Sequence, residues 1–202
     1  MDTQAQNILP GFSEPVQQSQ QTFRKVLDAM SHPGRIVKLD DTPEGPETLS
    51  AAATAVCLTL LDFETPVWLD KTAEQGAGYL KFHCNCPITD LSTSAQFAVI
   101  GDANAIESLE RFNLGSNNNP ERAATLIVEV SHIDNEADFT LSGPGIKDQA
   151  YLNIQGISDQ FKQLIAENNL LFPRGLDFIF TCGHQLVAIP RSTQIALKEL
   201  EL

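Results

Sequence analysis

Two short apolar runs separated by a glycine–histidine pair constrain the fold of this chain most. Residues 178–180 and 186–189 are of strand length and rich in β-forming side chains. The pair at 183–184 fits a two-residue type II′ turn, so we expect a hairpin. Both runs are nearly continuous instead of alternating, which favours strands buried on both faces, in a sheet between two layers. Pro190 has no N–H group, and the second strand should end there.

Polar residues gather at the margins of this hairpin. Arg174 and Asp177 precede it, and Arg191, Ser192 and Thr193 follow it. Two arginines held at the ends of a buried hairpin could present an anion site or a partner surface. The alternative is that they are solvated charges or ion-pair partners at strand ends, which is the commoner role of such arginines.

The rest of the chain mixes helical and strand-like patterns. The segment 14–30 is typical of an amphipathic helix, because Phe23, Val26, Leu27 and Met30 follow the spacing i, i+3, i+4, i+7 and should face the core. Alanine-rich 49–61 predicts a buried helix. Further helices are expected at 102–112 and 157–168, strands at 35–39, 66–69, 79–84, 97–100, 124–130 and 139–141, and one or two frayed helical turns at 194–202. We therefore expect an α/β fold, a mixed β-sheet flanked by helices, with residues 1–202 forming a single domain after a lead-in at 1–13.

Charge and hydropathy exclude several classes of protein. Thirteen lysines and arginines against 26 aspartates and glutamates give a formal net charge of −13. This balance argues against binding to nucleic acid or to an anionic membrane. No apolar run approaches the roughly 20 residues of a membrane span, and the first residues lack the pattern of a signal peptide. We expect a cytoplasmic protein whose four cysteines are reduced.

Two clusters are weak candidates for a bound ion. The run from His83 to Cys86 contains a histidine and two cysteines, but no second ligand pair accompanies it, and on the expected strand neighbouring side chains point to opposite faces. No metal site is therefore predicted. The glycine-rich residues 142–146 could offer backbone N–H groups to a phosphate, or could simply form a tight turn.

The turn at 31–35 is the stronger candidate. Pro33 forces the helix to end, Arg35 follows directly, and Arg24 lies about two helical turns back. His32 could act as an acid or base, although a histidine at a helix end more often caps the last carbonyl groups. No set of nucleophile, base and orienting group can be assembled, so no catalytic residue is predicted for this chain alone.

Six segments follow one another in order along nearly the whole chain. They are QTFR with AMSHPG at 21–34, LTLLD with TPVWL at 58–69, KFH before Pro87, ATLI at 124–127, LSGPGI at 141–146, and FPRGLD, TCG and AIPRST at 172–193. Together these segments resemble the H-subunit family of the bacterial carbon–phosphorus lyase complex (PhnH, phosphonate metabolism).

This resemblance implies a fold like that of the PLP-dependent transferases but without the cofactor. It also implies a homodimer in isolation and assembly with the G, I, J and L subunits of that complex. In that family the complex supports the formation of ribose 1-alkylphosphonate 5-triphosphate from ATP and an alkylphosphonate (ribose 1-methylphosphonate 5-triphosphate synthase). The chemistry is attributed mainly to the I subunit, so the resemblance implies an accessory subunit without a cofactor of its own.

Two hypotheses follow from the sequence. In the first, the chain is an accessory subunit of the carbon–phosphorus lyase complex. In the second, it is a stand-alone protein or enzyme that binds a small anion, a phosphonate or a nucleotide, at an arginine-lined turn. The residues predicted to bind an anion or a partner are Arg24, Ser31, His32, Gly34, Arg35, Asp177 and Arg191.

Overall fold

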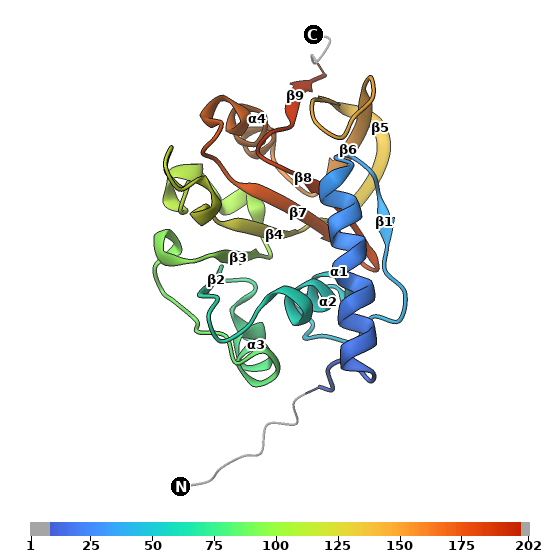
Figure 1. Ribbon diagram of the computed structural model, residues 1–202, viewed down its shortest axis with the longest axis vertical. Coiled ribbons are helices and arrows are strands. Elements are labelled where there is room, and N and C mark those ends of the chain that lie inside the picture. The colour runs from blue at the N-terminus through green and yellow to red at the C-terminus, as the bar shows by residue number, and fades with distance from the viewer. Residues whose placement is uncertain (1–8, 199–202) are drawn as a thin grey trace, which may run out of the picture.

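The computed structural model describes residues 9–198. Its centre is a six-stranded sheet in the order β1-β8-β7-β4-β3-β2 (Figure 1). Strands β2, β3, β4 and β7 are parallel to one another, β8 runs antiparallel to β7, and β1 runs antiparallel to β8. The strands are β1 (Val37–Lys38), β2 (Val67–Leu69), β3 (Phe97–Ile100), β4 (Thr125–Glu129), β7 (Asp177–Cys182) and β8 (Gln185–Ile189).

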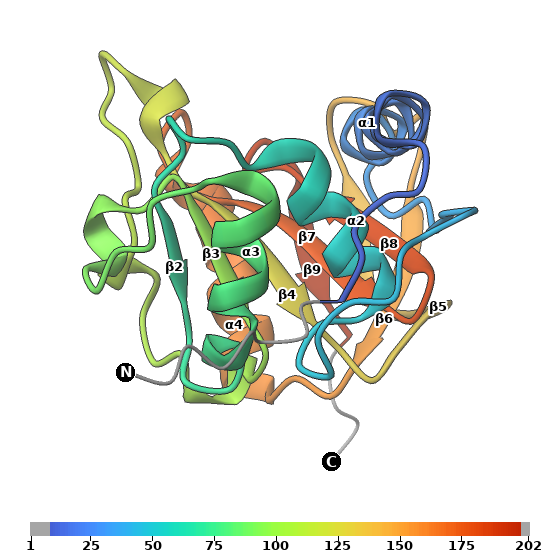
Figure 2. The ribbon, with the colours of Figure 1, turned by 90° about the horizontal axis from the view of Figure 1, so that it is seen from below.

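Two different layers cover the two faces of this sheet. Three helices lie on one face, α1 (Pro15–Ser31), α2 (Ala51–Leu60) and α3 (Ala77–Cys84), and we call the apolar cluster beneath them the helical core. On the other face, α4 (Asp159–Asn168) packs with a three-stranded antiparallel sheet, and we call that cluster the second core (Figure 2). The second sheet has the order β6-β5-β9 and consists of β5 (His132–Ser142), β6 (Ala150–Gln155) and β9 (Gln194–Leu197). Short 3₁₀ turns are η1 (Glu74–Gly76), η2 (Ser92–Ser94), η3 (Ala103–Ala105), η4 (Leu109–Arg111), η5 (Pro120–Arg122) and η6 (Asn169–Leu171).

The central strands are buried on both faces, as the continuous apolar runs predict. Along β7, Ile179 belongs to the helical core, whereas Phe178 and Phe180 belong to the second core. Successive side chains of a strand point to opposite faces, so each central strand supplies apolar groups to both cores. The hairpin of β7 and β8 is confirmed, and β8 ends at Ile189, directly before Pro190.

Helix ends follow the capping residues. The side chain of Ser50 accepts a hydrogen bond from the Ala53 N–H, and that of Ser158 accepts one from Phe161 N–H, at the first turns of α2 and α4. The expected mixed α/β architecture with a mixed sheet and flanking helices is confirmed, and so are the buried alanine-rich helix and the helix after residue 157.

The prediction of a strand at 79–84 is wrong. This segment is the helix α3, in which Leu80 and Cys84, one turn apart, are buried against the helical core. Asn85 ends the helix in the left-handed conformation, with φ 54°, and its N–H donates to the Lys81 carbonyl oxygen. A run of five or six residues with alternating polarity fits both the period of a helix and that of a strand. Here the contact of Leu80 and Cys84 with the helical core decides in favour of the helix.

Two further predictions are corrected by local hydrogen bonds and by pairing. The helix expected at 102–112 is two separate 3₁₀ turns, because the side chains of Asp102 and Ser108 each accept from a backbone N–H two residues on and start a new turn. The prediction of helical turns at 194–202 is wrong for Gln194–Leu197, because this segment is the strand β9 and pairs with β5. Residues 199–202 lie outside the described residues. The acidic segment 134–138 lies inside β5, at an irregularity in the pairing of β5 with β6. Strand β6 is not among the strands predicted from the sequence, because its polar residues hide the strand pattern.

Helix α1 buries a narrower face than its apolar pattern predicts. Val26 and Ala29 are buried and Met30 is partly buried, but Phe23 is 45% exposed and Leu27 is 50% exposed. The expectation that all four large apolar residues face the core is therefore wrong for these two. Helix α1 contacts the alanine-lined α2 and β8 along one narrow line, which leaves the adjacent ridge of the helix in solvent.

This placement predicts different costs for two neighbouring truncations. Val26→Ala should lower the free energy of unfolding by about 1–3 kcal/mol, because it empties a buried site. Leu27→Ala should cost less than about 1 kcal/mol, because much of that side chain is already hydrated. Urea unfolding of both variants measures the difference. Equal costs would contradict the orientation of α1.

Candidate functional site

The turn after α1 is a polar cluster built from main-chain and side-chain caps. The Ser31 hydroxyl donates to the Leu27 carbonyl oxygen at 2.8 Å, and the His32 N–H donates to the Asp28 carbonyl oxygen at 3.0 Å. His32 Nδ1 lies 3.1 Å from Asp28 Oδ1 and 3.2 Å from Ser31 Oγ. A catalytic triad requires the hydroxyl and the carboxylate on different ring nitrogens, whereas both groups lie at Nδ1 here. The arrangement is that of a helix C-terminal cap.

Arg35 and Gly34 also have structural partners in this turn. Arg35 forms an ion pair with Asp28 at 2.9 Å, in which both side chains are partly exposed. Gly34 adopts φ 85°, and a Cβ atom at this position would lie 2.8 Å from the Leu141 side chain. The glycine therefore permits both the left-handed turn and its close packing on β5.

The structure brings together two segments that the sequence singles out separately. A Cβ atom on Gly145 would lie 2.2 Å from the Ser31 carbonyl oxygen, so the glycine-rich loop after β5 packs directly on the turn after α1. On its other side, Gly143 lies against the backbone of Ser192. The loop thus fills the space between the 31–35 turn and the segment that follows β8.

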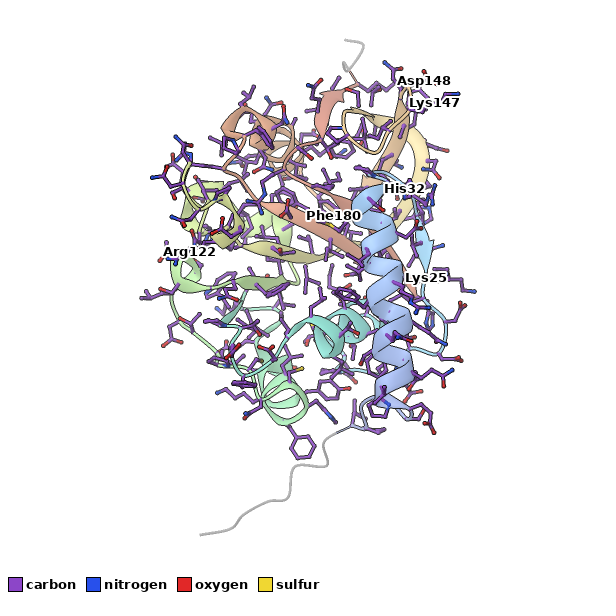
Figure 3. All side chains as sticks on the ribbon, viewed as in Figure 1. Lys25, His32, Arg122, Lys147, Asp148 and Phe180 are labelled. Atoms are coloured by element: carbon purple, nitrogen blue, oxygen red, sulfur yellow. The ribbon has the colours of Figure 1, made fainter. Side chains whose placement is uncertain are left out.

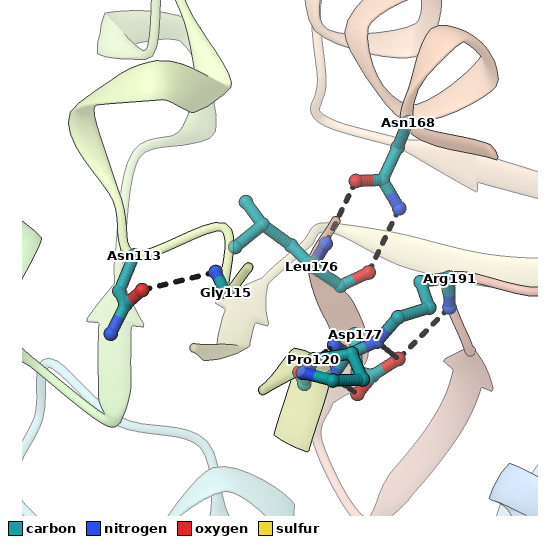
Figure 4. Close-up of polar contacts among 7 residues, drawn as sticks. All are labelled: Asn113, Gly115, Pro120, Asn168, Leu176, Asp177 and Arg191. Atoms are coloured by element: carbon teal, nitrogen blue, oxygen red, sulfur yellow. Dashed lines mark hydrogen bonds and ion pairs between the residues drawn. The ribbon is translucent and has the colours of Figure 1, made fainter. Parts of the chain in front are cut away.

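Arg191 and Asp177 form a nearly buried bidentate pair (Figure 4). The side chains of Arg191 and Asp177 are 15% and 16% exposed, respectively. The backbone N–H of Arg191 also donates a hydrogen bond to Asp177 Oδ1 at 2.9 Å. The guanidinium further donates to the Pro120 carbonyl oxygen. These contacts join the start of β7, the end of β8 and the loop before β4, so the pair has a structural role.

The seven predicted site residues therefore do not converge on one pocket. Ser31, His32, Gly34 and Arg35 share the turn after α1, Asp177 and Arg191 bind each other, and Arg24 is exposed on α1. That any of them binds an anion or a partner stays a prediction.

Cysteine and histidine side chains show no metal-like arrangement among the residues described. No group of three or more His, Cys, Asp or Glu side chains in that part of the chain could hold a metal ion. Cys84 and Cys86 are buried. Cys86, through a side-chain hydrogen bond, and burial together raise the pKa of Cys84, so it behaves as a core thiol.

Glu129 is a buried acid that the sequence interpretation missed. It ends β4, and its carboxylate accepts the Ser50 N–H at 2.6 Å, at the first turn of α2. Burial raises the pKa of Glu129 above its ordinary value, although the hydrogen bonds from Ser50 oppose this shift. A single acid inside the apolar run 124–130 is the signal that could have pointed to it.

The two arginine pairs predict unequal costs of truncation. Arg191→Ala leaves Asp177 charged in a nearly buried site and should lower the free energy of unfolding by about 3–5 kcal/mol. Arg35→Ala breaks a solvent-exposed pair and should cost no more than about 1 kcal/mol. Denaturant unfolding compares them. A similar small cost for both variants would show that Arg191 is not a structural tie.

Glu129 predicts a pH dependence that a glutamine should remove. Because the pKa is raised in the folded state, the stability contributed by Glu129 is complete below its ordinary pKa of about 4.5 and is lost as the pH rises through the raised value. Glu129→Gln should therefore gain stability relative to the natural chain as the pH rises above about 4.5. Urea unfolding across pH measures the difference, with exposed Glu121→Gln as control. A pH-independent difference would contradict the prediction.

Comparison with known proteins shows the family of this chain. The model of the family described as bacterial phosphonate metabolism protein (PhnH) matches residues 10–196. A protein of Rhizobium meliloti named alpha-D-ribose 1-methylphosphonate 5-triphosphate synthase subunit PhnH is 33% identical over 197 residues, which cover 96% of this chain and 98% of the relative. A putative C-P lyase subunit protein, HtxG, of Stutzerimonas stutzeri is 33% identical over 180 residues, or 89% of this chain and 86% of the relative. None of the described helices is both long and apolar enough to span a membrane. The chain belongs to the bacterial phosphonate metabolism protein (PhnH) family.

Proposed function

We propose that this chain is an accessory, non-catalytic subunit of a carbon–phosphorus lyase complex. In this role it supports the formation of ribose 1-alkylphosphonate 5-triphosphate from ATP and an alkylphosphonate, without itself supplying the catalytic groups. The names of the two relatives support this assignment. The structural observation that carries it is a line of three exposed apolar side chains along α1.

Three exposed apolar residues of α1, Val16, Phe23 and Leu27, lie along its outward side with the exposed Gln20 among them, and we call the three the α1 ridge. Their exposed fractions are 88%, 45% and 50%. At about 100° per residue, positions i, i+7 and i+11 lie within about 40° of one another, so the three side chains form one line along the helix. Figure 3 shows α1 on the outside of the molecule, with Lys25 near the middle of the helix and His32 just after its last turn.

The composition of α1 differs from that of the surrounding surface. In a chain of net charge −13, this 17-residue helix carries three charged side chains, Arg24, Lys25 and Asp28. Interface cores are typically depleted in charge and enriched in aromatic side chains and arginine. Phe23 beside Arg24 fits this description, and gives Arg24 a role in partner binding instead of anion binding. Phe63 and Phe82, on the same side of the sheet, are also exposed.

The finer parts of the proposal concern partners, location and fold. We expect the α1 ridge to contact another subunit of the complex, among the G, I, J and L subunits, and to be covered by a second copy of the chain when those partners are absent. We also expect a cytoplasmic location and a fold related to the PLP-dependent transferases, with no PLP bound.

Co-expression tests the proposal. The tagged chain, produced together with its candidate G, I and J partners, should elute as one high-mass assembly. Leu27→Glu should reduce the retained partner at least about tenfold, because it places a charge in the apolar contact. Leu170→Glu, at an 82% exposed leucine on η6, is the matched control and should retain the partners.

Two outcomes would count against the proposal. If no partner is retained by the unmodified chain even at low salt, the assembly role is wrong. If Leu27→Glu and Leu170→Glu retain partners equally, the assembly forms through another surface. Circular dichroism of both variants establishes that they are folded.

A further inference from the structure

A crevice opens where the chain leaves two neighbouring parallel strands in opposite directions. β2 and β3 are parallel, so their carboxyl ends meet at the same edge of the sheet. After Leu69 the chain turns to the helical core, where Ala73 is buried, whereas after Ile100 it turns to the second core, where Ala103 and Ile106 are buried. Divergence of this kind creates the crevice in which open α/β sheets bind their ligands.

The cavity at this place is of a size suited to a small molecule. Its volume is about 660 Å³, within the usual range of ligand pockets. It is lined by loop 70–75 on one side and by loop 102–111 on the other. The side chains that matter for the argument are Trp68, Lys71, Asp102, Ile106 and Arg111.

Asp70 holds the two walls of the crevice together. This carboxylate is 7% exposed and accepts hydrogen bonds from the Thr72 hydroxyl and the Ala73 N–H in its own loop. It also accepts from the N–H groups of Gly101, at 3.0 Å, and Asp102, at 2.9 Å, in the opposite loop. Both oxygens are occupied, so Asp70 builds the site and its charge is already compensated by four donors.

The guanidinium of Arg111 lies over the Trp68 ring, and both side chains line the cavity. The guanidinium carbon of Arg111 lies 5.1 Å from the centroid of the Trp68 ring. Neither Arg111 nor Lys71 forms an ion pair with any residue between 9 and 198. Two cations without an ion-pair partner among the described residues therefore line one cavity.

Asp102 is the remaining carboxylate at the crevice. Its Oδ1 accepts the Asn104 N–H at 3.0 Å, which leaves Oδ2 able to accept a hydrogen bond from a ligand hydroxyl group. The cavity therefore offers an aromatic and apolar wall, two cations and one hydroxyl acceptor.

We propose that this crevice binds a nucleotide, that is, a ligand in which a flat ring, a sugar and a phosphate are joined. The ring stacks against the Arg111–Trp68 pair and Ile106. The phosphate binds Lys71 and the edge of the guanidinium, and the free Asp102 oxygen accepts a sugar hydroxyl. This binding site is distinct from the α1 ridge and does not depend on the assembly role.

The position of the tryptophan makes the test direct. Trp68 is the single tryptophan of the chain, so its emission reports on the crevice. The full-length chain is titrated with AMP and with ATP, and with adenosine and inorganic triphosphate as the two halves of the ligand. We expect a saturable change in Trp68 emission with AMP or ATP, and at least about tenfold weaker binding of either half alone. Free tryptophan amide corrects for light absorbed by the nucleotides, and calorimetry gives an independent affinity.

Matched variants identify the side chains that bind the nucleotide. Arg111→Gln and Lys71→Gln should each weaken the binding of the same nucleotide at least about tenfold, which corresponds to about 1.4 kcal/mol. Arg122→Gln removes an exposed arginine that does not line the cavity and should leave the affinity unchanged (Figure 3). Thermal unfolding and circular dichroism are recorded for each variant, and Lys71→Gln, at an exposed side chain, is the variant least able to disturb the fold.

Three results would overturn the proposal. The first is no saturable binding of AMP or ATP up to millimolar concentration by either method. The second is equal binding of adenosine and ATP, which would remove the role of the cations. The third is nucleotide binding that Lys71→Gln and Arg111→Gln weaken no more than Arg122→Gln does.

Discussion

The burial of both faces of the six-stranded sheet is the constraint on which the other features depend. Each central strand supplies one set of side chains to the helical core and the alternate set to the second core. Polar groups within these strands are consequently confined to their ends, where Asp177 and Glu129 lie. The Asp177–Arg191 pair and the contact of Glu129 with α2 then join neighbouring elements, which explains why these charges are internal ties and not an open site.

Local signals in the sequence predict those parts of the fold that depend on near neighbours. The β7–β8 hairpin, the alanine-rich α2 and the helix after residue 157 were all recognisable because turn geometry and helix patterns act within a few residues. The segments 79–84 and 194–197 were not, since a short apolar pattern fits both periods until a distant partner is known. For 194–197 that partner is β5. The exposed side of α1 illustrates the same limit, because an apolar stripe does not reveal which part of it a neighbour covers.

The candidate site was predictable to a smaller extent. The turn at 31–35 and the hairpin margins were recognised as motifs, but the glycine-rich loop that packs between them and their ion pairs depend on tertiary structure. The sequence predicts that Trp68 lies on a strand at 66–69, and assigns it no role in a site. Its contact with Arg111 comes from a 3₁₀ turn 43 residues later in the chain, in a segment expected to be one continuous helix. The crevice arises from the divergence of two connections, and no spacing of residues encodes that divergence.

The shortness of the outer strands has a consequence for how this protein can associate. β1 has two residues and β2 has three, and the outer side of β2 carries only a single bridge between Val67 and Ile88. Such an edge offers few free N–H and C=O groups, and it resists the addition of a strand from another chain. A partner bound through the proposed α1 ridge would instead contact side chains on the helical surface. Such a surface can be remodelled by single substitutions without disturbing a ladder of main-chain hydrogen bonds.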